Sequence, residues 1–332
     1  MTHLKELRLT RFKSFRGAVL PLRDLTLLIG RNGSGKSNAI DGLHVLAALA
    51  CGEDVEGAVR GGLAGCAPYG EDSFALGCTA ADGSSWDVEV SVAGEVASSE
   101  LPAPVAAALR GVFILDPVPA LMRGYAQADD TELRRQADNV SAVLGGLSGE
   151  RWERLVDVVR SLPEQHVEGV EVEHGAEGVM LALRERIGPR SVRFTAQVMS
   201  DGMLRFLAFA AALGTARPDT QLVIEEVENG LHPSQAAEIV RMFKGSGIRT
   251  FATTHSPAIL TALSAADHDG VVVCRRDPVT AVSELVPLVD LPAYPEALAA
   301  GTLGDAVASR RLEARVDPGA RLDALQRLLG DL

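Results

Sequence analysis

The sequence feature that most constrains this chain is a glycine-rich turn at residues 30–37. An apolar run from Leu25 to Ile29 leads into it, and Gly30 is followed after four residues by Gly35-Lys36-Ser37. Glycines allow successive backbone N–H groups to converge on a phosphate, and a helix that begins there adds the positive end of its dipole. The apolar run predicts a strand and residues 36–50 predict a helix, which is the context that the motif requires. The turn is therefore predicted to be a phosphate-binding loop.

The residue types in this loop have separate expected roles. Lys36 would reach the β- and γ-phosphates of a nucleotide, and the Ser37 hydroxyl would hold Mg²⁺. The predicted nucleotide-binding residues of the loop are Gly30, Arg31, Asn32, Gly33, Ser34, Gly35, Lys36, Ser37 and Asn38.

Composition limits the class of protein. The chain has 332 residues, of which 47% are hydrophobic, which is enough for a large buried core. Its longest apolar candidate for a membrane span, residues 206–216, is shorter than the ~20 residues required and contains Gly214. Charged residues at the start of the chain argue against a signal peptide. We therefore expect a cytoplasmic protein without a membrane partner.

The cysteines and the net charge set further limits. The four cysteines are too scattered for a disulfide framework or a Cys-x-x-Cys zinc site, and we expect small core residues in a reducing compartment: Cys51, Cys66, Cys78 and Cys274. A net charge of −12 argues against a protein coated in nucleic acid. A local basic patch can still bind phosphates, so DNA binding stays open.

Periodicity along the chain predicts an α/β fold with a mostly parallel sheet. Strands are expected within residues 4–29, 73–92 (a hairpin), 170–183, 221–225, 249–253, 270–274 and 282–289. Helices are expected within residues 36–50, 101–162, 201–213 and 321–329, with a further helix opened by Pro233.

A pair of carboxylates, Glu225 and Glu226, follows one of the buried strands. In an enzyme with a phosphate-binding loop, the first acid at this strand end holds Mg²⁺ and the second orients or deprotonates the attacking water. Alone, the pair would be read as acidic residues of a solvated loop. Beside the phosphate-binding loop, we interpret Glu225 as a metal ligand and Glu226 as the catalytic base.

Two more polar segments are candidates for contact with the γ-phosphate. His255 follows the next buried strand, so it would emerge at the same sheet edge as Glu226, where ligands bind in open α/β sheets. Ser200, Asp201 and Gly202 begin the predicted helix 201–213 and offer a hydroxyl at a helix N-terminus. The alternative for Ser200 is a simple N-cap.

Taken together, these motifs resemble the ABC-type ATPases of the SMC, RecF and OLD class, in particular the compact "AAA family" ATPases built as that head domain alone. The resemblance covers nearly the whole chain and rests on ordered elements: Phe12-Lys13-Ser14-Phe15, residues 30–38, Arg60-Gly61-Gly62, Ser200-Asp201-Gly202, Glu225-Glu226, residues 228–233 and Thr254-His255-Ser256-Pro257.

The resemblance implies an ATP- and Mg²⁺-dependent ATPase that works as a head-to-tail homodimer. Residues 200–202 would be the signature motif, which contacts the γ-phosphate bound to the opposite subunit, and Asn229 would lie in the loop that crosses the dimer axis. His255 would sense the γ-phosphate. Arg60 resembles the arginine that lies near the phosphates in SMC heads, or it is an exposed loop residue.

Departures from related families narrow the subgroup. A transporter ATPase would carry Leu-Ser-Gly-Gly-Gln and an Asp before the catalytic Glu, whereas this chain has Met199-Ser200-Asp201-Gly202-Met203 and Glu225. No heptad arm or zinc hook separates Ser37 from Ser200, so a full SMC protein is excluded. Asp267-His268-Asp269 is interpreted as a solvated turn rather than a Toprim metal site. The glutamine that normally follows the β-rich subdomain cannot be placed, and Gln127 is a weak candidate.

We expect one head over residues 1–332: lobe I from 1–95 and 215–300, a helical signature lobe from about 96–214, and a C-terminal helical tail from about 301–332. The leading hypothesis is an ATP-driven dimer that switches a DNA transaction, in repair or in defence against phage. The alternatives are an ATP-binding regulatory or scaffold subunit of an effector protein such as a nuclease, with little turnover, and a transporter ATPase. Scattered basic residues near the start of the chain are candidate nucleic-acid contacts: Lys5, Arg8, Arg11, Lys13 and Arg16.

Overall fold

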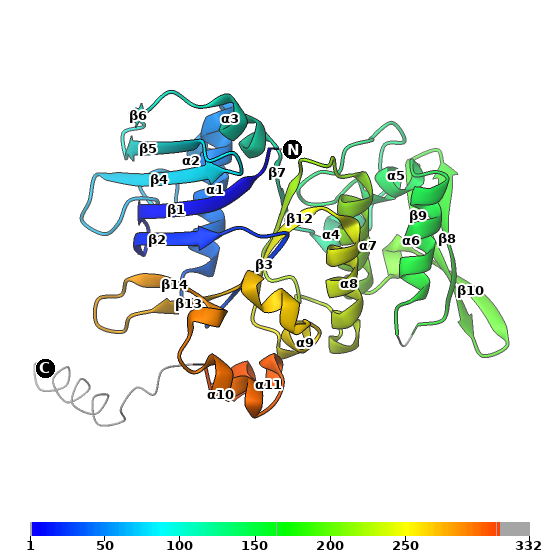
Figure 1. Ribbon diagram of the computed structural model, residues 1–332. Coiled ribbons are helices and arrows are strands. Elements are labelled where there is room, and N and C mark those ends of the chain that lie inside the picture. Colours follow the sequence, from blue (N-terminus) through cyan, green and yellow to red (C-terminus); the bar gives the residue numbers. More distant parts are fainter. Residues whose placement is uncertain (1, 164, 310, 313–332) are drawn as a thin grey trace, which may run out of the picture.

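The computed structural model describes residues 2–163, 165–309, 311 and 312, and its elements are arranged around one long sheet (Figure 1). The eleven strands of this main sheet are, in spatial order, β6 (Val96–Ser98), β5 (Ser85–Ser91), β4 (Ser73–Ala80), β1 (Leu4–Phe12), β2 (Phe15–Pro21), β14 (Ser283–Pro287), β13 (Val271–Arg276), β3 (Leu25–Ile29), β12 (Arg249–Thr254), β11 (Gln221–Ile224) and β7 (Val112–Leu115).

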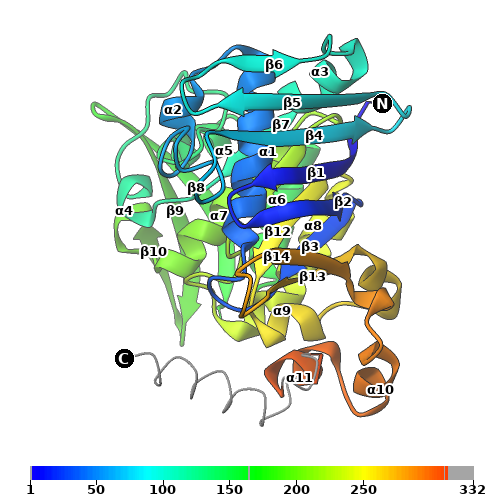
Figure 2. The ribbon, with the colours of Figure 1, turned by 90° about the vertical axis from the view of Figure 1, so that its left-hand side faces the viewer.

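The main sheet has a parallel part and an antiparallel part. Strands β13, β3, β12, β11 and β7 run parallel to their neighbours in that series, whereas β6, β5, β4, β1 and β2 are antiparallel. Figure 2 shows how β2 and β14 join the two parts into one continuous surface. The predicted α/β fold, with a mostly parallel central sheet and an antiparallel subdomain, is confirmed.

Burial explains why the two parts differ in sequence. All four residues of β11 are buried, as expected of a parallel strand covered on both faces. In β5, buried and exposed residues alternate because only one face of the antiparallel part is covered. The hairpin predicted within residues 73–92 is β4 and β5, with their turn at Ala81–Ser84.

The helices cover the main sheet and fill the second lobe, the region predicted above as the signature lobe at about residues 96–214. Their bounds are α1 (Lys36–Cys51), α2 (Val55–Ala58), α3 (Ala103–Arg110), α4 (Pro119–Met122), α5 (Val140–Gly145), α6 (Glu150–Arg160), α7 (Asp201–Thr215), α8 (Ala236–Ser246), α9 (Pro257–Thr261), α10 (Tyr294–Ala299) and α11 (Leu303–Ala308). The helix predicted at Pro233 is confirmed, because a 3₁₀ turn, Pro233–Gln235, leads directly into α8.

The second lobe contains more β-structure than the sequence predicted. A separate antiparallel sheet has the order β10 (Arg190–Thr195), β9 (Gly178–Ile187) and β8 (Val167–Gly175), so the strand expected within residues 170–183 is a hairpin. The expectation of helix throughout residues 101–162 is wrong at β7, which pairs with β11 in the main sheet. Periodicity alone does not distinguish a short buried strand from a buried helical turn.

The expectation of helix is also wrong within residues 123–139, which lie between α4 and α5. The Asn139 side chain accepts the Arg134 N–H and donates to the Glu132 carbonyl, and this closes the segment into a loop. Asn competes in this way with helical hydrogen bonding.

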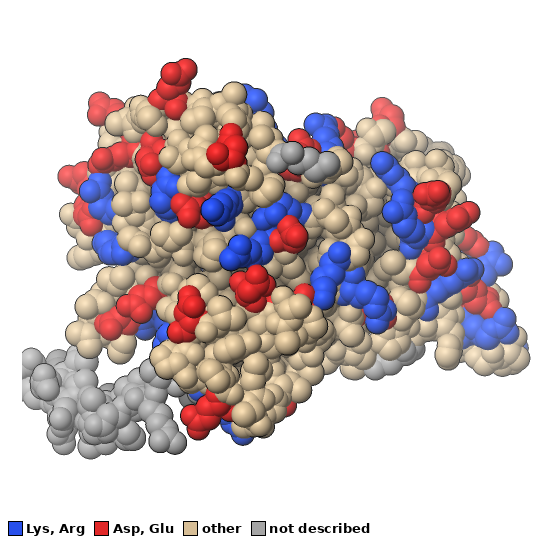
Figure 3. All heavy atoms as spheres, viewed as in Figure 1, with Lys and Arg blue, Asp and Glu red and all other residues tan. Residues whose placement is uncertain are grey.

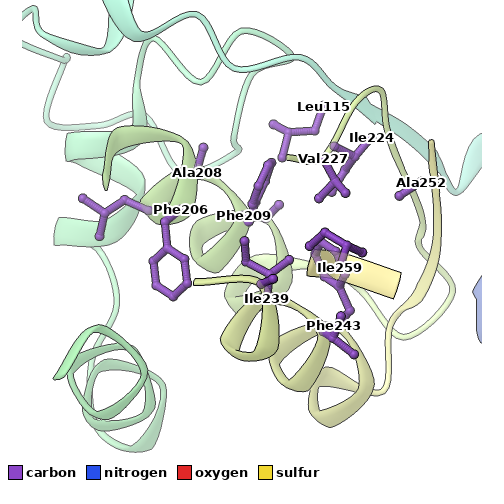
Figure 4. Close-up of a cluster of buried hydrophobic side chains, with 14 of the residues drawn as sticks. Leu115, Phe206, Ala208, Phe209, Ile224, Val227, Ile239, Phe243, Ala252 and Ile259 are labelled. Atoms are coloured by element: carbon purple, nitrogen blue, oxygen red, sulfur yellow. The ribbon is translucent and has the colours of Figure 1, made fainter. Parts of the chain in front are cut away.

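Two apolar clusters pack on opposite sides of the main sheet. One lies beneath α1 and α3 and the antiparallel strands. The other surrounds α7, which is apolar on almost every side and is packed between the sheet, α8 and the second lobe. Figure 4 shows this second cluster, in which Phe206 and Phe209 of α7 face Ile239 and Phe243 of α8. Burial of large side chains at both faces fixes the sheet between them.

Three further expectations can be compared with the structure. Cys66, Cys78 and Cys274 are buried as predicted, but Cys51 is exposed at the end of α1. Within the described ranges, no helix is long and apolar enough to cross a membrane. The helix predicted at residues 321–329 lies outside the described residues.

Candidate nucleotide-binding site

Three parallel strands end at one edge of the main sheet and bring the predicted site residues together. Gly30 follows β3, Glu225 follows β11, and His255 follows β12, which lies between them. Because parallel strands share their direction, their carboxyl ends form one crevice, the usual ligand site of an open α/β sheet.

The phosphate-binding loop adopts a conformation that requires glycine. Gly30 has φ 154°, and a Cβ there would overlap the backbone carbonyl of Cys274. Gly35 has φ 115°, and its Cβ would lie 2.6 Å from Ser283 Oγ. Both positions combine positive φ with a close neighbour, so a side chain is excluded. Arg31, Asn32 and Gly33 form the exposed tip of the loop.

The side chains of Lys36 and Ser34 are buried within the loop. Lys36 is 6% exposed, and its Nζ donates to the carbonyl oxygens of Gly30 at 2.8 Å and Arg31 at 3.1 Å. Ser34 Oγ is buried without a hydrogen-bond partner among the described residues. A buried donor without a partner is costly unless something satisfies it, and a phosphate oxygen would do so. Asn38 instead donates to Ser14 Oγ in the β1–β2 turn, at 2.8 Å.

Ser37 and Glu225 meet directly. The Ser37 hydroxyl donates to Glu225 Oε1, which joins the start of α1 to the end of β11. The same carboxylate accepts from Arg60 Nη2, with distances of 3.1 Å to Oε2 and 3.3 Å to Oε1. Arg60 therefore contacts Glu225, and it is also an exposed loop residue, as the plainer interpretation expected, with a side chain that is 60% exposed.

Asp41 and Lys13 extend this network around Glu225 and Arg60, and neither was predicted as a site residue. Asp41 Oδ2 accepts from Lys13 Nζ at 2.7 Å, and its Oδ1 lies 3.5 Å from Arg60 Nη2. Asp41 lies one helical turn after Ser37, so this i, i+4 spacing was a signal available in the sequence. Burial lowers the pKa of Arg60, but Asp41 and Glu225 offset this effect, and the net pKa is raised above its ordinary value.

Glu226 is held at both its backbone and its carboxylate. Its φ of 48° is unusual for a residue other than glycine, and its N–H donates to Thr253 Oγ1 at 2.8 Å. Its Oε2 accepts from Asn229 Nδ2 at 2.7 Å. Strained backbone of this kind persists where the surroundings hold it, as at active sites.

His255 is oriented by Glu228, which the sequence did not identify as a partner. Glu228 Oε1 accepts a hydrogen bond from the backbone N–H of His255 at 2.6 Å, and the same oxygen lies 2.7 Å from His255 Nδ1. The His255 ring is half exposed. It borders a cavity of about 780 Å³ whose other walls are residues 30–34, the β13–β14 hairpin and α11.

The predicted signature segment, residues 200–202, has a different set of neighbours. Ser200 Oγ accepts the Met203 N–H at 3.2 Å and caps α7, as the simpler interpretation predicted. Asp201 pairs with Arg123 at 2.7 Å. Gly202 packs so closely on the Gly230 carbonyl that a Cβ would overlap it. The signature segment and the Asn229 loop therefore form one continuous surface.

Two weaker sequence candidates lie elsewhere. Gln127 follows Ala126, which pairs with Val179 in the second sheet. In the Asp267-His268-Asp269 segment, Asp267 pairs with Lys244 at 2.8 Å, and His268 is buried beside Tyr294 rather than solvated. The described part of the chain holds no cluster of three or more His, Cys, Asp or Glu side chains suited to a metal ion.

The basic residues near the start of the chain are mostly neutralised. Arg8 pairs with Asp87 and Glu6, Arg11 with Glu71 and Glu89, Arg16 with Glu71, and Lys13 with Asp41. Figure 3 shows cations and anions interspersed over the face viewed in Figure 1. This face is therefore not a free basic patch.

Comparison with protein families decides the classification. Residues 25–100 and 122–261 match the family model described as "AAA domain, putative AbiEii toxin, Type IV TA system". The chain belongs to this AAA family. No curated protein matches the chain.

Solved structures of SMC heads share this AAA protein's fold. The SMC head domain from Thermotoga maritima has a TM-score of 0.52 at 17% identity, covering 86% of this chain and 98% of that one. An SMC head bound to the C-winged helix domain of ScpA has a TM-score of 0.56 at 15% identity, covering 86% and 97%. The head from Pyrococcus yayanosii, with a coiled coil and joint, has a TM-score of 0.54 at 11% identity, covering 86% and 97%. The predicted fold of an SMC-type head is confirmed.

Proposed function

We propose that this AAA protein is a Mg²⁺-dependent ATPase that converts ATP and water to ADP and phosphate. The observation that carries the proposal is the hydrogen bond between Ser37 and Glu225 beside a loop that only glycine can form. It joins the phosphate-binding loop to the strand end where a nucleotide-bound metal requires oxygen ligands.

The donor set fits Mg²⁺. The hydroxyl of Ser37 and the carboxylate of Glu225 are hard oxygen ligands, and Mg²⁺ bound to a nucleotide usually takes only one or two ligands from the protein. A bound Mg²⁺ would neutralise charge on the phosphates. Lys36 and the backbone N–H groups of residues 30–38 would hold the phosphate oxygens, and Ser34 Oγ would gain the partner that it lacks.

The proposed catalytic groups are Glu226, His255 and Lys36. Glu226 would orient or deprotonate the attacking water, with its carboxylate positioned by Asn229. His255 would read the γ-phosphate from the neighbouring strand end, oriented by Glu228. Phosphoryl transfer to water needs little beyond positioning and charge stabilisation, which these groups supply.

We also propose that two chains complete each other's sites. The surface formed by Ser200–Gly202 and Asn229 would face the phosphate-binding loop of a second copy, so that two ATP molecules lie between the heads. The unit is one head over residues 1–332, with lobe I from 1–95 and 215–300, the signature lobe from about 96–214 and the tail from about 301–332. β7 belongs by sequence to the signature lobe but by pairing to the main sheet.

Sedimentation velocity tests the dimer. Glu226→Gln with Mg²⁺ and ATP should give a stable dimer, because ATP binds but is not hydrolysed. Lys36→Ala in the same background should restore the monomer by removing a phosphate contact. A Glu226→Gln protein that stays monomeric at saturating ATP would overturn the head-to-tail model.

The proposed output is a switch in a DNA transaction, in repair or in defence against phage. Support for DNA comes from the class of fold and not from the N-terminal cations, of which Arg8, Arg11, Lys13 and Arg16 are ion-paired. ATPase rate and gel mobility, measured with single-stranded DNA, double-stranded DNA and RNA, decide this part. If neither quantity responds to any of them, the nucleic-acid partner should be abandoned.

The family description favours one alternative. It names a toxin of a toxin–antitoxin system, which suggests a chain that acts with a partner protein. In this alternative, ATP binding would hold an effector such as a nuclease, with little turnover. A wild-type chain that binds ATP but hydrolyses it no faster than Glu226→Gln would support it.

A further inference from the structure

Asp41 is a buried carboxylate that holds two cations from different parts of the chain. Its side chain is 8% exposed and lies on α1 one turn beyond Ser37. Lys13 reaches it from the β1–β2 turn, and Arg60 reaches it from the loop after α2. A buried carboxylate is tolerated only when it is paired, and here both oxygens have cationic partners.

The loop that carries Arg60 is built to hold its backbone while the side chain stays exposed. Gly61 and Gly62 have φ of 83° and 59°, and Glu56 Oε2 accepts the Leu63 N–H at 2.8 Å. The Arg60 carbonyl accepts from Lys13 Nζ at 3.2 Å. The Arg60 side chain is 60% exposed, so its guanidinium can move without unpacking the core.

The Arg60 guanidinium pairs with Glu225, the carboxylate that a bound metal would also need. Glu225 accepts from both Ser37 and Arg60. A dication and a guanidinium repel each other at one carboxylate. Binding of the metal to Glu225 and Ser37 would therefore displace Arg60, and Asp41 would remain as its anionic partner.

We propose that Arg60 is a switch that occupies Glu225 when no metal–nucleotide complex is bound, and that Asp41 is the positioning residue about which it turns. The inference deepens the proposed function and rests on it, because it takes Glu225 as a metal ligand. On displacement, Arg60 stays tethered at the rim of the phosphate site, where its charge faces the bound nucleotide.

Binding of Mn²⁺, used as a spectroscopic substitute for Mg²⁺, tests the competition. Free Mn²⁺ is measured by electron paramagnetic resonance during titration of the full-length chain without nucleotide. Arg60→Ala should tighten Mn²⁺ binding by roughly two- to fivefold, the scale of an exposed ion pair. Arg134→Ala is the matched control, because that exposed arginine pairs with Asp130 and Asp138 away from the site, and it should change nothing. Unchanged or weaker Mn²⁺ binding in Arg60→Ala would overturn the proposal.

A double variant tests the role of Asp41. Asp41→Asn should weaken Mn²⁺ binding, because Arg60 is left with Glu225 as its only carboxylate partner among the described residues. In an Arg60→Ala background, Asp41→Asn should have no further effect. If Asp41→Asn weakens Mn²⁺ binding equally in both backgrounds, Asp41 acts on the metal directly, and the proposal that Arg60 turns about Asp41 is wrong. If Asp41→Asn does not fold, the comparison of Arg60→Ala with wild type still decides the competition.

The same titration with ADP, scored as the Mn²⁺ bound beyond the amount that ADP binds alone, separates failure of the switch from failure of the proposed function. A wild-type chain that binds Mn²⁺ neither with nor without ADP has no metal site, and the proposed function fails. If the wild-type chain binds Mn²⁺ and Arg60→Ala binds it no more tightly, the proposed metal site is retained and only the proposed switch fails.

Discussion

Glu226 has a backbone conformation that its own sequence does not favour, and Thr253 on the neighbouring strand stabilises it. The Thr253 side chain is fully buried, and its hydroxyl accepts the Glu226 N–H. The β11–β12 pairing, in which Ile224 lies opposite Ala252, brings these two residues together. The orientation of the proposed catalytic base is therefore set by a residue one strand away.

Thr253→Val should separate catalysis from ATP binding. The substitution keeps the side-chain shape but leaves the Glu226 N–H without its acceptor, which costs about 1–3 kcal/mol of stability. We expect kcat for ATP hydrolysis to fall while the Kd for ATP changes little, measured by phosphate release and calorimetric titration. Thr250→Val is the control: Thr250 is also fully buried on β12, but its hydroxyl bonds to Ile248 O, away from the strand end. A similar loss of kcat in both variants would contradict a specific role for Thr253.

At the scale of elements, α7 connects the apolar core to the proposed dimer surface. Its buried face packs against α8 through Phe209 and Phe243, whose ring centroids are 6.1 Å apart. Its first turn presents Ser200–Gly202 beside Gly230. The close approach of Gly202 to Gly230 fixes the signature segment against the loop that carries Asn229.

Gly202→Ala should impair dimerisation more than ATP binding. A methyl group at this position would push the first turn of α7 away from Gly230, at a cost of about 1–3 kcal/mol. In the Glu226→Gln background, we expect loss of the ATP-dependent dimer in sedimentation, with ATP affinity retained. Gly214→Ala is the matched control on the same helix, because its new Cβ would make an ordinary contact with Leu147. It should gain up to about 1 kcal/mol of stability and leave the dimer intact. An unaffected dimer in Gly202→Ala would refute the packing argument.

At the scale of the whole molecule, the main sheet separates two apolar clusters and holds the site at the carboxyl ends of its parallel strands. Helix α1 carries Lys36, Ser37 and Asp41 on one side of the sheet, and α7 carries the signature segment on the other (Figure 1). Strands β3, β11 and β12 are shared by both halves. Unfolding of either cluster would therefore disrupt the site, and stability of the whole chain is a necessary control for every variant.

The stability of the whole chain should fall in mild acid. Burial lowers the pKa of His44, with a smaller contribution from Arg135, and burial also lowers the pKa of His268. The folded chain therefore favours the neutral rings, whereas the unfolded chain takes up protons near the ordinary histidine pKa of about 6.5. Acid thus favours the unfolded state. We expect the free energy of unfolding, from urea titrations, to decrease from about pH 7 to about pH 5.

His44→Gln should make this decrease shallower, because one group that binds a proton only on unfolding is removed. His174→Gln, at an exposed position on β8, is the control and should leave the slope unchanged. An identical slope in wild type and His44→Gln would contradict the assignment to His44.

Local sequence patterns were sufficient to predict the strands, turns and helix that carry most of the predicted site residues. The spacing of Gly30, Gly35, Lys36 and Ser37, the apolar runs of β3, β11 and β12, and the polar residue that follows each run are all visible in the sequence. Parallel strand ends meet at one edge, so the convergence of Ser37, Glu225 and His255 could be predicted without coordinates. Strand β7 and the loop before α5 could not, because a short apolar run and a helical spacing each admit more than one structure.

By itself, the sequence determined the phosphate-binding loop, the α/β fold and the acids at the strand end, because each depends on residues close together in the chain. Only the tertiary structure decided which partners hold those residues. Asp41 with Lys13 and Arg60, Glu226 with Thr253, Glu228 with His255, and Gly202 with Gly230 are pairs separated by 19 to 28 residues. Such pairs leave no periodic pattern, since their contact depends on how strands and helices pack. The same packing neutralised the N-terminal arginines, which the sequence alone left available for nucleic acid.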